Sequence, residues 1–467
     1  LNPDNSWVTA SWNQFYRMIF KTNTIIGRAE MDLVKWDSEQ EKNAIIAEAK
    51  FLRAFFYTQL ANMWGGVPLV LEETASPKFD YTRVSQAEVY NQCVEDLLFA
   101  TNNMNTVDMQ KGGMAPRAAA YHQLAQVYIQ LEKYQEAINA ATQVIDNPNY
   151  QLMTERFGKY TDFTFNGYDY QGEQEPWGDV YFDLFGDGNF NRTDGNMECI
   201  WNMQMEFDQR GGGTGFLSLE SWFGGPLMSS VSDIDGVVNP IMDTLQGRPV
   251  GRYLGTDYLN NKIWEFKGDW DRDIRNSKYN IQREYYFTNP NSRFYGQRVT
   301  AENMAPPSDF YARTTPSFKK AIQYVHYGMV ITNGQAWDYG ATHKDWYIMR
   351  LAETYLLRAE AYHLSGDNIK AAADINTIRN RAQATPVEPG EVNIDLILDE
   401  RARELYMEEF RINTLMRMGK LTEYLNKYNE YIETNQQTIE EYKNKFPIPR
   451  AEIEANKEAV LEQNPGY

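Results

Sequence analysis

The chain has 467 residues, of which 42% are hydrophobic and 14% aromatic, so it can bury a sizeable core. Its formal net charge of -19 argues against nucleic acid or an anionic membrane surface as partner, because both attract clustered Lys and Arg. No apolar run approaches the roughly 18 residues that a membrane-spanning helix needs.

The N-terminal part of the chain shows the apolar periodicity of amphipathic helices. Helices are predicted over residues 15–30 and 42–63, and a third begins at a capping box and runs over 85–104. Gly65 and Gly66 end the second helix, because glycine at this point breaks the helical backbone and a proline soon follows.

A pair of helices joined by a short turn is predicted next, over residues 117–131 and 134–146. From 150 to 343 helical periodicity fades, and Gly, Asn, Asp and aromatic residues become frequent. This composition is typical of irregular loops with short strands, which often carry function on a rigid scaffold. We therefore expect a loop-rich, aromatic insert over 150–343, between helical segments at 1–149 and 344–467.

Residues 346–382 form a second predicted pair of antiparallel helices, with Gly366 ending the first helix and Asp367 capping the second. Small and aromatic residues have the same spacing in both pairs: Ala125, Tyr128 and Ala137 correspond to Ala359, Tyr362 and Ala371. Such hairpins are similar to tetratricopeptide (TPR) units, which can stack in space. The predicted fold is mainly α, a TPR-like helical-hairpin scaffold with a loop-rich insert.

The C-terminal part is predicted to contain a helix over 395–420, a polar helix over 421–445 and a proline-bounded tail over 446–467. Cys93 lies on an apolar helical stripe, which favours a buried free thiol. A disulfide between Cys93 and Cys199 is the alternative that the sequence leaves open.

Short catalytic motifs are absent: the chain has no HExxH, GxSxG, P-loop or CxxC. The run from Asp187 to Asn191, followed by Glu198, is similar to a calcium loop, but Arg192 stands where the turn needs glycine. We therefore predict no catalytic residue, no metal and no cofactor. A carboxylate-based glycosidase stays an alternative, because such enzymes have no short signature.

The insert contains the side chains that a sugar-binding surface needs. Sugars present C–H faces that stack on flat aromatic rings, and hydroxyls that bind short polar side chains. Trp222 and Phe223 stand between glycine-rich runs, which places them on a loop, whereas Trp201 is expected in the core. The predicted ligand-binding residues are Trp222, Phe223, Tyr253, Trp264 and, near the start of the chain, Trp7.

Several segments together resemble the SusD/RagB family, and they occur in that family's order along nearly the whole chain. The segments are 47–70, 349–382, 397–421, 446–467 and GDWDRDIRNSKY at 268–279. The last is similar to the family's Asp-Arg-Asp-Pro-Arg segment, with Ile274 in the place of proline. Glu409 and Phe410 depart from the small residue and histidine that are usual before Arg411.

The resemblance implies a single SusD-like unit over 1–467, built on four TPR-like helix pairs. It implies a non-catalytic lipoprotein of the Bacteroidetes outer membrane, exposed at the cell surface and anchored by a lipid upstream of Leu1. Such a protein captures oligosaccharides or polysaccharides and delivers them to a SusC-like TonB-dependent transporter. Two alternatives stay open: a TPR-type scaffold subunit that binds only the transporter, and capture of peptide.

The resemblance also bears on a run of charged residues at helical spacing. They are Glu400, Arg401, Glu404, Glu408 and Arg411. Surface ion pairs are the usual result of such spacing. Because the family keeps these positions, a partly buried network that braces the helices is the preferred interpretation. No ligand-binding residue is carried over, because the family has no invariant ligand motif.

Overall fold

The computed structural model is mainly α-helical, as predicted, and it divides into two compact units. The first unit comprises Leu1–Asn149, Thr354–Ala371 and Glu409–Tyr467, and the second comprises Tyr150–Glu353 and Ala372–Glu408. The C-terminal part predicted as scaffold is thus shared between them. The structure describes residues 2–107, 113–162, 177–206, 222–223, 231–239, 251, 253–310, 314–322, 330–332, 335–337 and 344–467.

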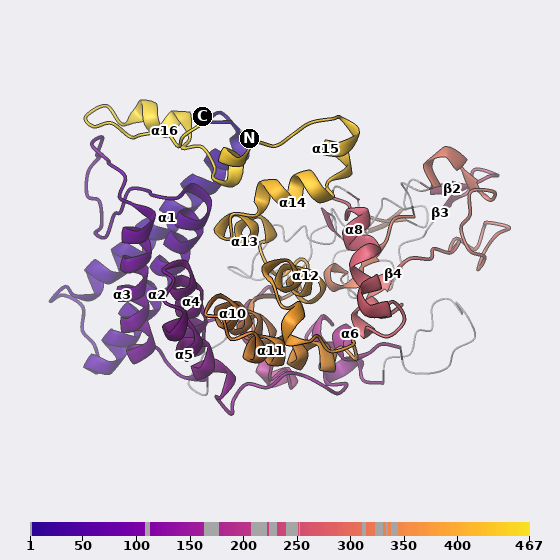
Figure 1. Cartoon of the computed structure of the whole chain (residues 1–467), viewed down its shortest axis with the longest axis horizontal. Coiled ribbons are helices and arrows are strands. Elements are labelled where there is room, and N and C mark those ends of the chain that lie inside the picture. The colour runs from indigo at the N-terminus through magenta and orange to yellow at the C-terminus, as the bar shows by residue number, and fades with distance from the viewer. Residues whose placement is uncertain are drawn as a thin grey trace. The chain divides into compact units, whose positions relative to one another are not determined.

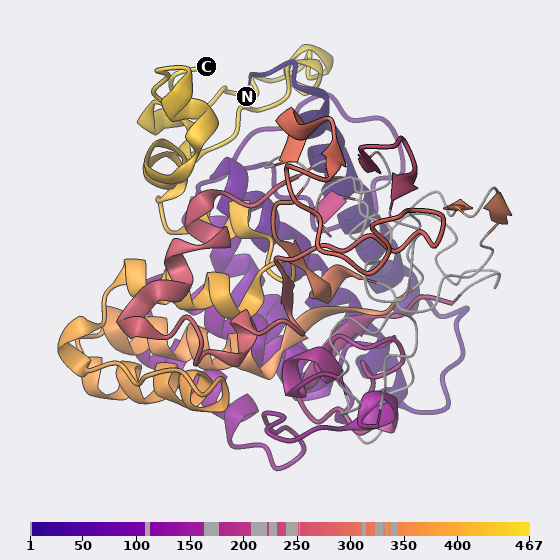
Figure 2. The same cartoon turned by 90° about the vertical axis from the view of Figure 1, so that its right-hand side faces the viewer.

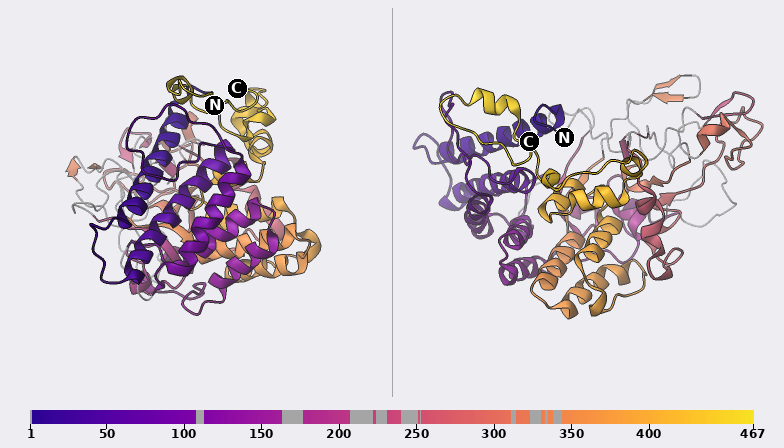
Figure 3. Two further views of the ribbon diagram at one scale, coloured as in Figure 1. Left: turned by 90° about the vertical axis from the view of Figure 1, so that its left-hand side faces the viewer. Right: turned by 45° about the horizontal axis from the view of Figure 1, so that its top comes forward.

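The first unit begins with five helices, each packed beside the next (Figure 1; Figure 3, left). They are α1 (Ser6–Ala29), α2 (Glu39–Trp64), α3 (Gln86–Asn103), α4 (Arg117–Gln130) and α5 (Tyr134–Ile145). Helix α1 starts earlier than predicted because the Asn5 side chain caps it, accepting from the backbone N–H groups of Trp7 and Val8. Gly65, with φ of 78°, ends α2, and the predicted capping box opens α3.

The second predicted hairpin begins with a strand, so its predicted start at Trp346 is wrong. Strand β9 (Trp346–Arg350) pairs antiparallel with β1 (Cys199–Met203), and helix α10 (Leu351–Leu364) follows. Aromatic and β-branched residues at 346–348 suit a buried strand, and pairing with β1 decides the outcome. The predicted turn is confirmed: Gly366 has φ of 88°, and helix α11 (Asn368–Arg381) follows.

Helix α10 stacks on the earlier hairpin within the first unit. Its Leu357 and Ala361 share a buried cluster with Ile129, Ala137 and Ile138 of α4 and α5. The Nδ1 atom of His122 and the hydroxyl of Thr354 lie 2.8 Å apart in a buried hydrogen bond. The stacking that the matched spacing allows is therefore present.

Two long C-terminal helices of the prediction are broken in the structure. The stretch predicted over 395–420 forms α12 (Ile394–Leu405) and α13 (Arg411–Arg417), with Met407 between them at φ of 69°. The polar stretch over 421–445 breaks because the Asn429 side chain caps a new helix. Its elements are α14 (Leu421–Tyr428), α15 (Glu430–Thr434) and the 3-10 helix η10 (Glu441–Asn444).

The tail contains α16 (Arg450–Ala455), which lies beside the N-terminal segment (Figure 1). Arg450 forms an ion pair with Asp4 at 2.7 Å, and its backbone N–H donates to the carbonyl of Pro3. The indole N–H of Trp64 donates to the Pro447 carbonyl in the interior. The tail is thus laid over the first unit.

The second unit holds short strands among long connections, as the composition of the insert predicts (Figure 2). Strand β2 (Val231–Asp233) pairs with β3 (Val238–Asn239) and β5 (Met304–Ala305). The other short pairs are β4 (Ile281–Gln282) with β6 (Ser317–Phe318), and β7 (Val330–Thr332) with β8 (Gln335–Trp337). Short helices include α6 (Val180–Leu184) and α8 (Asp257–Asn260).

Both cysteines are buried free thiols, which confirms the prediction for Cys93. Burial raises the pKa of Cys93 to about 12, so this thiol stays protonated and inert near neutral pH. Trp201 is buried in β1, as expected. Among the helices of the described ranges, none combines the length and apolarity that crossing a membrane requires.

Candidate ligand-binding site

Three of the predicted ligand-binding residues form one contact group in the second unit. The rings of Phe223 and Tyr253 are stacked, with centroids 5.1 Å apart and planes 17° apart. Trp222 contacts Tyr253 at 5.6 Å in a tilted arrangement. The backbone N–H of Tyr253 donates to the Trp222 carbonyl at 2.9 Å, which ties the two chain segments together. We refer to Trp222, Phe223 and Tyr253 as the aromatic cluster.

The aromatic cluster is open to solvent. Trp222 is 41% exposed and Tyr253 is 54% exposed, and Leu254 beside it is also exposed. Grouped aromatic rings on a surface mark an interaction site more often than isolated ones do. Flat rings can cover the C–H faces of a sugar, and the three side chains carry no charge near neutral pH. The cluster can therefore bind a neutral ligand by stacking.

The other two predicted residues have different surroundings. Trp264 is only 2% exposed and packs with Ile281 and Phe318, so its assignment to the ligand site is corrected. Its indole N–H donates to the Leu259 carbonyl at 2.9 Å, which satisfies the one polar atom of a core residue. Trp7, 43% exposed, belongs to the first unit, where its ring meets that of Phe446 edge-on at 5.5 Å.

The charged residues near Glu404 form a buried network in the second unit. Such a network is the interpretation that the sequence favours over surface ion pairs. The Glu404 carboxylate accepts from Arg350, Arg381 and Arg275 at 2.5 to 3.1 Å, and from the hydroxyl of Tyr181. Each arginine bonds at least one further acid of the network. The remaining acids are Glu198, Asp273, Glu400 and Glu408.

The membership of this network differs from the prediction in two ways. Arg401 pairs with Glu353 at 2.5 Å, and Arg411 pairs with Glu409 at 2.9 Å. Arg350 and Arg381 join from distant parts of the sequence, and helical spacing within one segment gives no sign of such partners. Burial alone raises the pKa of Glu400, but nearby arginines, above all Arg275, outweigh it and lower the pKa to about 2.

The run that is similar to a calcium loop is accounted for by other contacts. Glu198 binds Arg350 and Arg381, and the Asn189 amide donates to the carbonyls of Phe157 and Asp183. Within the described ranges, no group of three or more His, Cys, Asp or Glu side chains is placed to hold a metal ion.

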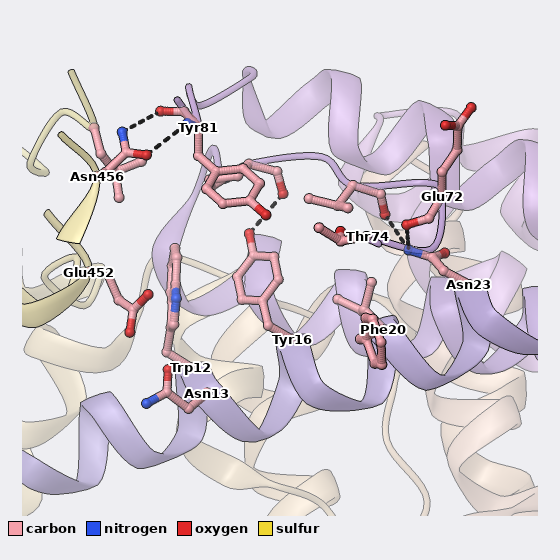
Figure 4. A pocket seen from close by; sticks show the side chains of 14 residues that line it. Trp12, Asn13, Tyr16, Phe20, Asn23, Glu72, Thr74, Tyr81, Glu452 and Asn456 are labelled. Carbon is pink, nitrogen blue, oxygen red and sulfur yellow. Dashed lines mark hydrogen bonds between the residues drawn. The ribbon is translucent and has the colours of Figure 1, made fainter. Parts of the chain in front are cut away.

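A pocket of about 300 Å³ lies in the first unit, and the sequence prediction did not include it (Figure 4). Helix α1 presents Trp12, Tyr16 and Phe20 to it at intervals of four, which place them on one helix face. The segment 68–81 and the tail from Glu452 to Leu461 supply the other walls. We call this the α1 pocket.

Hydrogen bonds hold the walls of the α1 pocket in place. The Tyr16 hydroxyl donates to the Pro68 carbonyl at 2.8 Å, and the Asn23 amide donates to the carbonyls of Val70 and Glu72. Asn456 joins the tail to Tyr81: its amide oxygen accepts from the Tyr81 N–H, and its amide nitrogen donates to the Tyr81 carbonyl (Figure 4). The pocket is thus built from segments far apart in the sequence.

The α1 pocket is acidic. Its described lining includes the carboxylates of Glu72 and Glu452 and no Lys, Arg or His. Burial raises the pKa of Glu452, and burial likewise raises the pKa of Tyr16. Among the described residues, the Glu452 carboxylate has no hydrogen-bond or ion-pair partner. The sequence contained one sign of this pocket. Trp12, Tyr16 and Phe20 lie at helical spacing, which becomes visible once Asn5 is recognised as the cap of α1.

The fold and the site define a helical-hairpin protein of TPR-like architecture that carries an exposed aromatic cluster on an irregular insert. Residues 135–467 match the sequence model of the SusD family, and residues 1–129 match a model described as starch-binding and associating with the outer membrane. The first match covers well over half of the chain. The chain therefore belongs to the SusD family.

Similar proteins are found along the whole chain. SusD-like protein P25 of Formosa agariphila is 24% identical over 478 residues, which covers 96% of this chain and 77% of that protein. The starch-binding protein SusD of Bacteroides thetaiotaomicron is 38% identical over 126 residues, covering 26% of this chain and 21% of that one. A solved laminarin-binding SusD-like protein superposes with a TM-score of 0.65 at 22% identity, covering 98% and 86% of the two chains.

Proposed function

We propose that this chain is a non-catalytic glycan-binding protein of the outer-membrane surface, with the aromatic cluster as its sugar contact. The stacked rings of Phe223 and the exposed Tyr253 carry the proposal, together with the exposed Trp222 beside them. An exposed group of rings has a cost in water unless a ligand covers it. A sugar's C–H face is a suitable cover, because it is flat, weakly hydrated and uncharged.

The names of related proteins support a carbohydrate ligand. One relative is a starch-binding protein, and one structural neighbour is a laminarin-binding protein. The model that matches residues 1–129 is described as associating with the outer membrane. We further propose that the chain is held at the cell surface by a lipid anchor and passes oligosaccharides to a SusC-like TonB-dependent transporter.

The buried acids support a binding role over hydrolysis. A glycosidase needs two carboxyl groups that face a bound sugar, one of them able to donate a proton. Glu400 and Glu404 are buried, and arginines lower the pKa of both, so neither can serve as an acid near neutral pH. The aromatic cluster itself has no carboxyl group among its three side chains.

The test is a binding screen combined with product analysis. The full chain is titrated with starch-type and laminarin-type oligosaccharides and with a wider glycan array, and reducing ends are measured after prolonged incubation. The proposal expects saturable binding of at least one glycan and no release of reducing ends. Product formation would contradict the non-catalytic role. Binding of no glycan, with the transporter still co-purifying, would favour a scaffold subunit instead.

A further inference from the structure

The α1 pocket has a chemical character that differs from the aromatic cluster, because it combines aromatic walls with a carboxylate. We propose that the α1 pocket binds the ammonium group of a small ligand, with Glu452 as the counter-ion and Trp12, Tyr16 and Tyr81 as the surrounding walls. The ammonium group can belong to an amino sugar or to a lysine side chain. This proposal does not rest on the glycan contact proposed above, because the α1 pocket is lined by other residues.

The aromatic walls of the pocket are held by contacts with neighbouring residues. The rings of Trp12 and Tyr16 contact each other with centroids 4.9 Å apart, and Trp12 also meets Trp64 edge-on at 5.5 Å. The Tyr16 hydroxyl is fixed by its bond to the Pro68 carbonyl. Ring faces attract cations through their negative quadrupole, most strongly where solvent is partly excluded.

The Glu452 carboxylate supplies the charge that such a site needs. The two fully buried acids in the described part of the first unit are paired with arginine: Asp96 with Arg53 at 2.7 Å, and Glu360 with Arg417 at 2.6 Å. The partly buried Glu48 accepts from the backbone N–H of Ala115. Glu452 is half-buried at the pocket and has no such partner in the described ranges. A cation entering the pocket would provide it.

Tyr16 and Glu452 line the same pocket, so the aromatic wall and the carboxylate can contact one ligand. The pKa of Tyr16 is raised mainly by burial, then by the neighbouring Tyr57, and then by the negative charge of Glu452. Figure 4 shows Trp12, Tyr16 and Glu452 together at the pocket, with Asn13 beside them. The Asn13 amide can bond a hydroxyl or an amide group of the ligand.

The size of the pocket limits the ligand to a small group. A volume of about 300 Å³ is at the lower end for small-molecule sites, which suits one sugar ring or the end of one side chain. A neutral sugar would leave Glu452 without a counter-ion. The pocket should therefore prefer glucosamine to glucose, and to N-acetylglucosamine, whose nitrogen carries no charge.

The test is calorimetric titration of the full chain with four probes: glucosamine, N-acetylglucosamine, glucose and Nα-acetyl-lysinamide. We expect saturable binding of glucosamine or Nα-acetyl-lysinamide, and at least about tenfold weaker binding of the two sugars without an ammonium group. Binding of glucosamine alone identifies an amino sugar as the source, and binding of Nα-acetyl-lysinamide alone identifies a peptide. Binding of neither, or equal binding of glucose and glucosamine, would overturn the proposal.

Two variants of helix α16 provide a matched comparison. Glu452→Gln keeps the shape of the side chain and removes its charge, and should weaken ammonium binding by about tenfold. Glu454→Gln makes the same change at an exposed position outside the pocket lining and should change affinity by less than about twofold. Equal affinity of the Glu452→Gln protein and the unchanged chain would also overturn the proposal. Trp222→Ala should leave ammonium binding intact, which separates this site from the glycan contact.

Discussion

Carboxylates removed from solvent differ in their ion pairing and in the direction of their pKa shift between two regions of this protein. Around Glu404, each acid is bonded to at least one arginine or lysine, and the pKa of Glu404 is held well below its usual value. In the α1 pocket, Glu452 has no partner among the described residues, and burial raises its pKa. The Glu404 network lies in the second unit and the α1 pocket in the first.

This difference in pairing distinguishes residues that stabilise the fold from residues that can bind a ligand. A buried charge that is fully paired holds elements together, and it has no bonding capacity left for a ligand. A partly buried charge that faces a cavity without a partner costs stability, and a ligand can relieve that cost. The same reasoning separates Trp264, whose only polar atom is satisfied in the core, from the exposed rings of Trp222 and Tyr253.

Removing one cation from the Glu404 network should have the largest effect on the stability of the fold. Arg350→Met leaves Glu198, Glu404 and Glu408 with one fewer counter-ion in the interior. The free energy of unfolding in urea should fall by about 3–5 kcal/mol, the usual result of unpairing a buried charge. Arg450→Met removes a surface pair with Asp4 and should change the free energy of unfolding far less. Similar losses for both variants would show that the network does not stabilise the fold.

Acidic pH should reduce the stability that the Glu404 network contributes. The pKa of Glu400 is about 2 in the folded chain against 4.5 as its ordinary value, so the folded state favours the ionised form. This stability is present above about pH 4.5 and is lost as pH falls towards 2, a difference of about 3 kcal/mol for this group. Urea unfolding at pH 7, 4.5 and 3 measures it. A free energy that does not change below pH 4.5 would contradict the low pKa.

The contribution of Glu452 to the free energy of unfolding should change with pH in the opposite direction. Its pKa is raised in the folded chain, so its ionised form destabilises folding once pH exceeds the ordinary pKa. Glu452→Gln should therefore leave stability at pH 7 unchanged or slightly higher, by less than about 1 kcal/mol because solvent screens a half-exposed group. Unfolding curves at pH 7 and pH 4 measure this. A clear loss of stability at pH 7 would mean that Glu452 has a structural partner.

The sequence predicts the helical scaffold well because local signals specify it. The capping box at Ser85, the turn at Gly366 and the matched Ala and Tyr spacing all act over a few residues. The strand at Trp346 was missed because its partner, Cys199–Met203, is distant in sequence. The break between α12 and α13 at Met407 was also missed from the sequence, because no proline or glycine marks it.

The candidate sites were predictable only in part. Glycine-rich flanks favoured a loop at Trp222 and Phe223, whereas the structure gives both residues helical conformation and joins them to Tyr253. Composition could not distinguish Trp264 from them, because burial depends on packing with Ile281 and Phe318. The α1 pocket needs Glu452 and Tyr81 from distant segments, and no spacing rule brings these together.

The central claim is that the aromatic cluster binds the glycan, and Trp222→Ala tests it most directly. Its matched control is Trp7→Ala, since Trp7 is similarly exposed and its ring packs against those of Phe410 and Phe446. Affinity for the glycan found in the screen is measured by calorimetry, and urea unfolding confirms that both variants are folded. The account predicts about tenfold weaker binding for Trp222→Ala, from the loss of one stacking ring, and unchanged binding for Trp7→Ala. Unchanged affinity of a folded Trp222→Ala protein would contradict it.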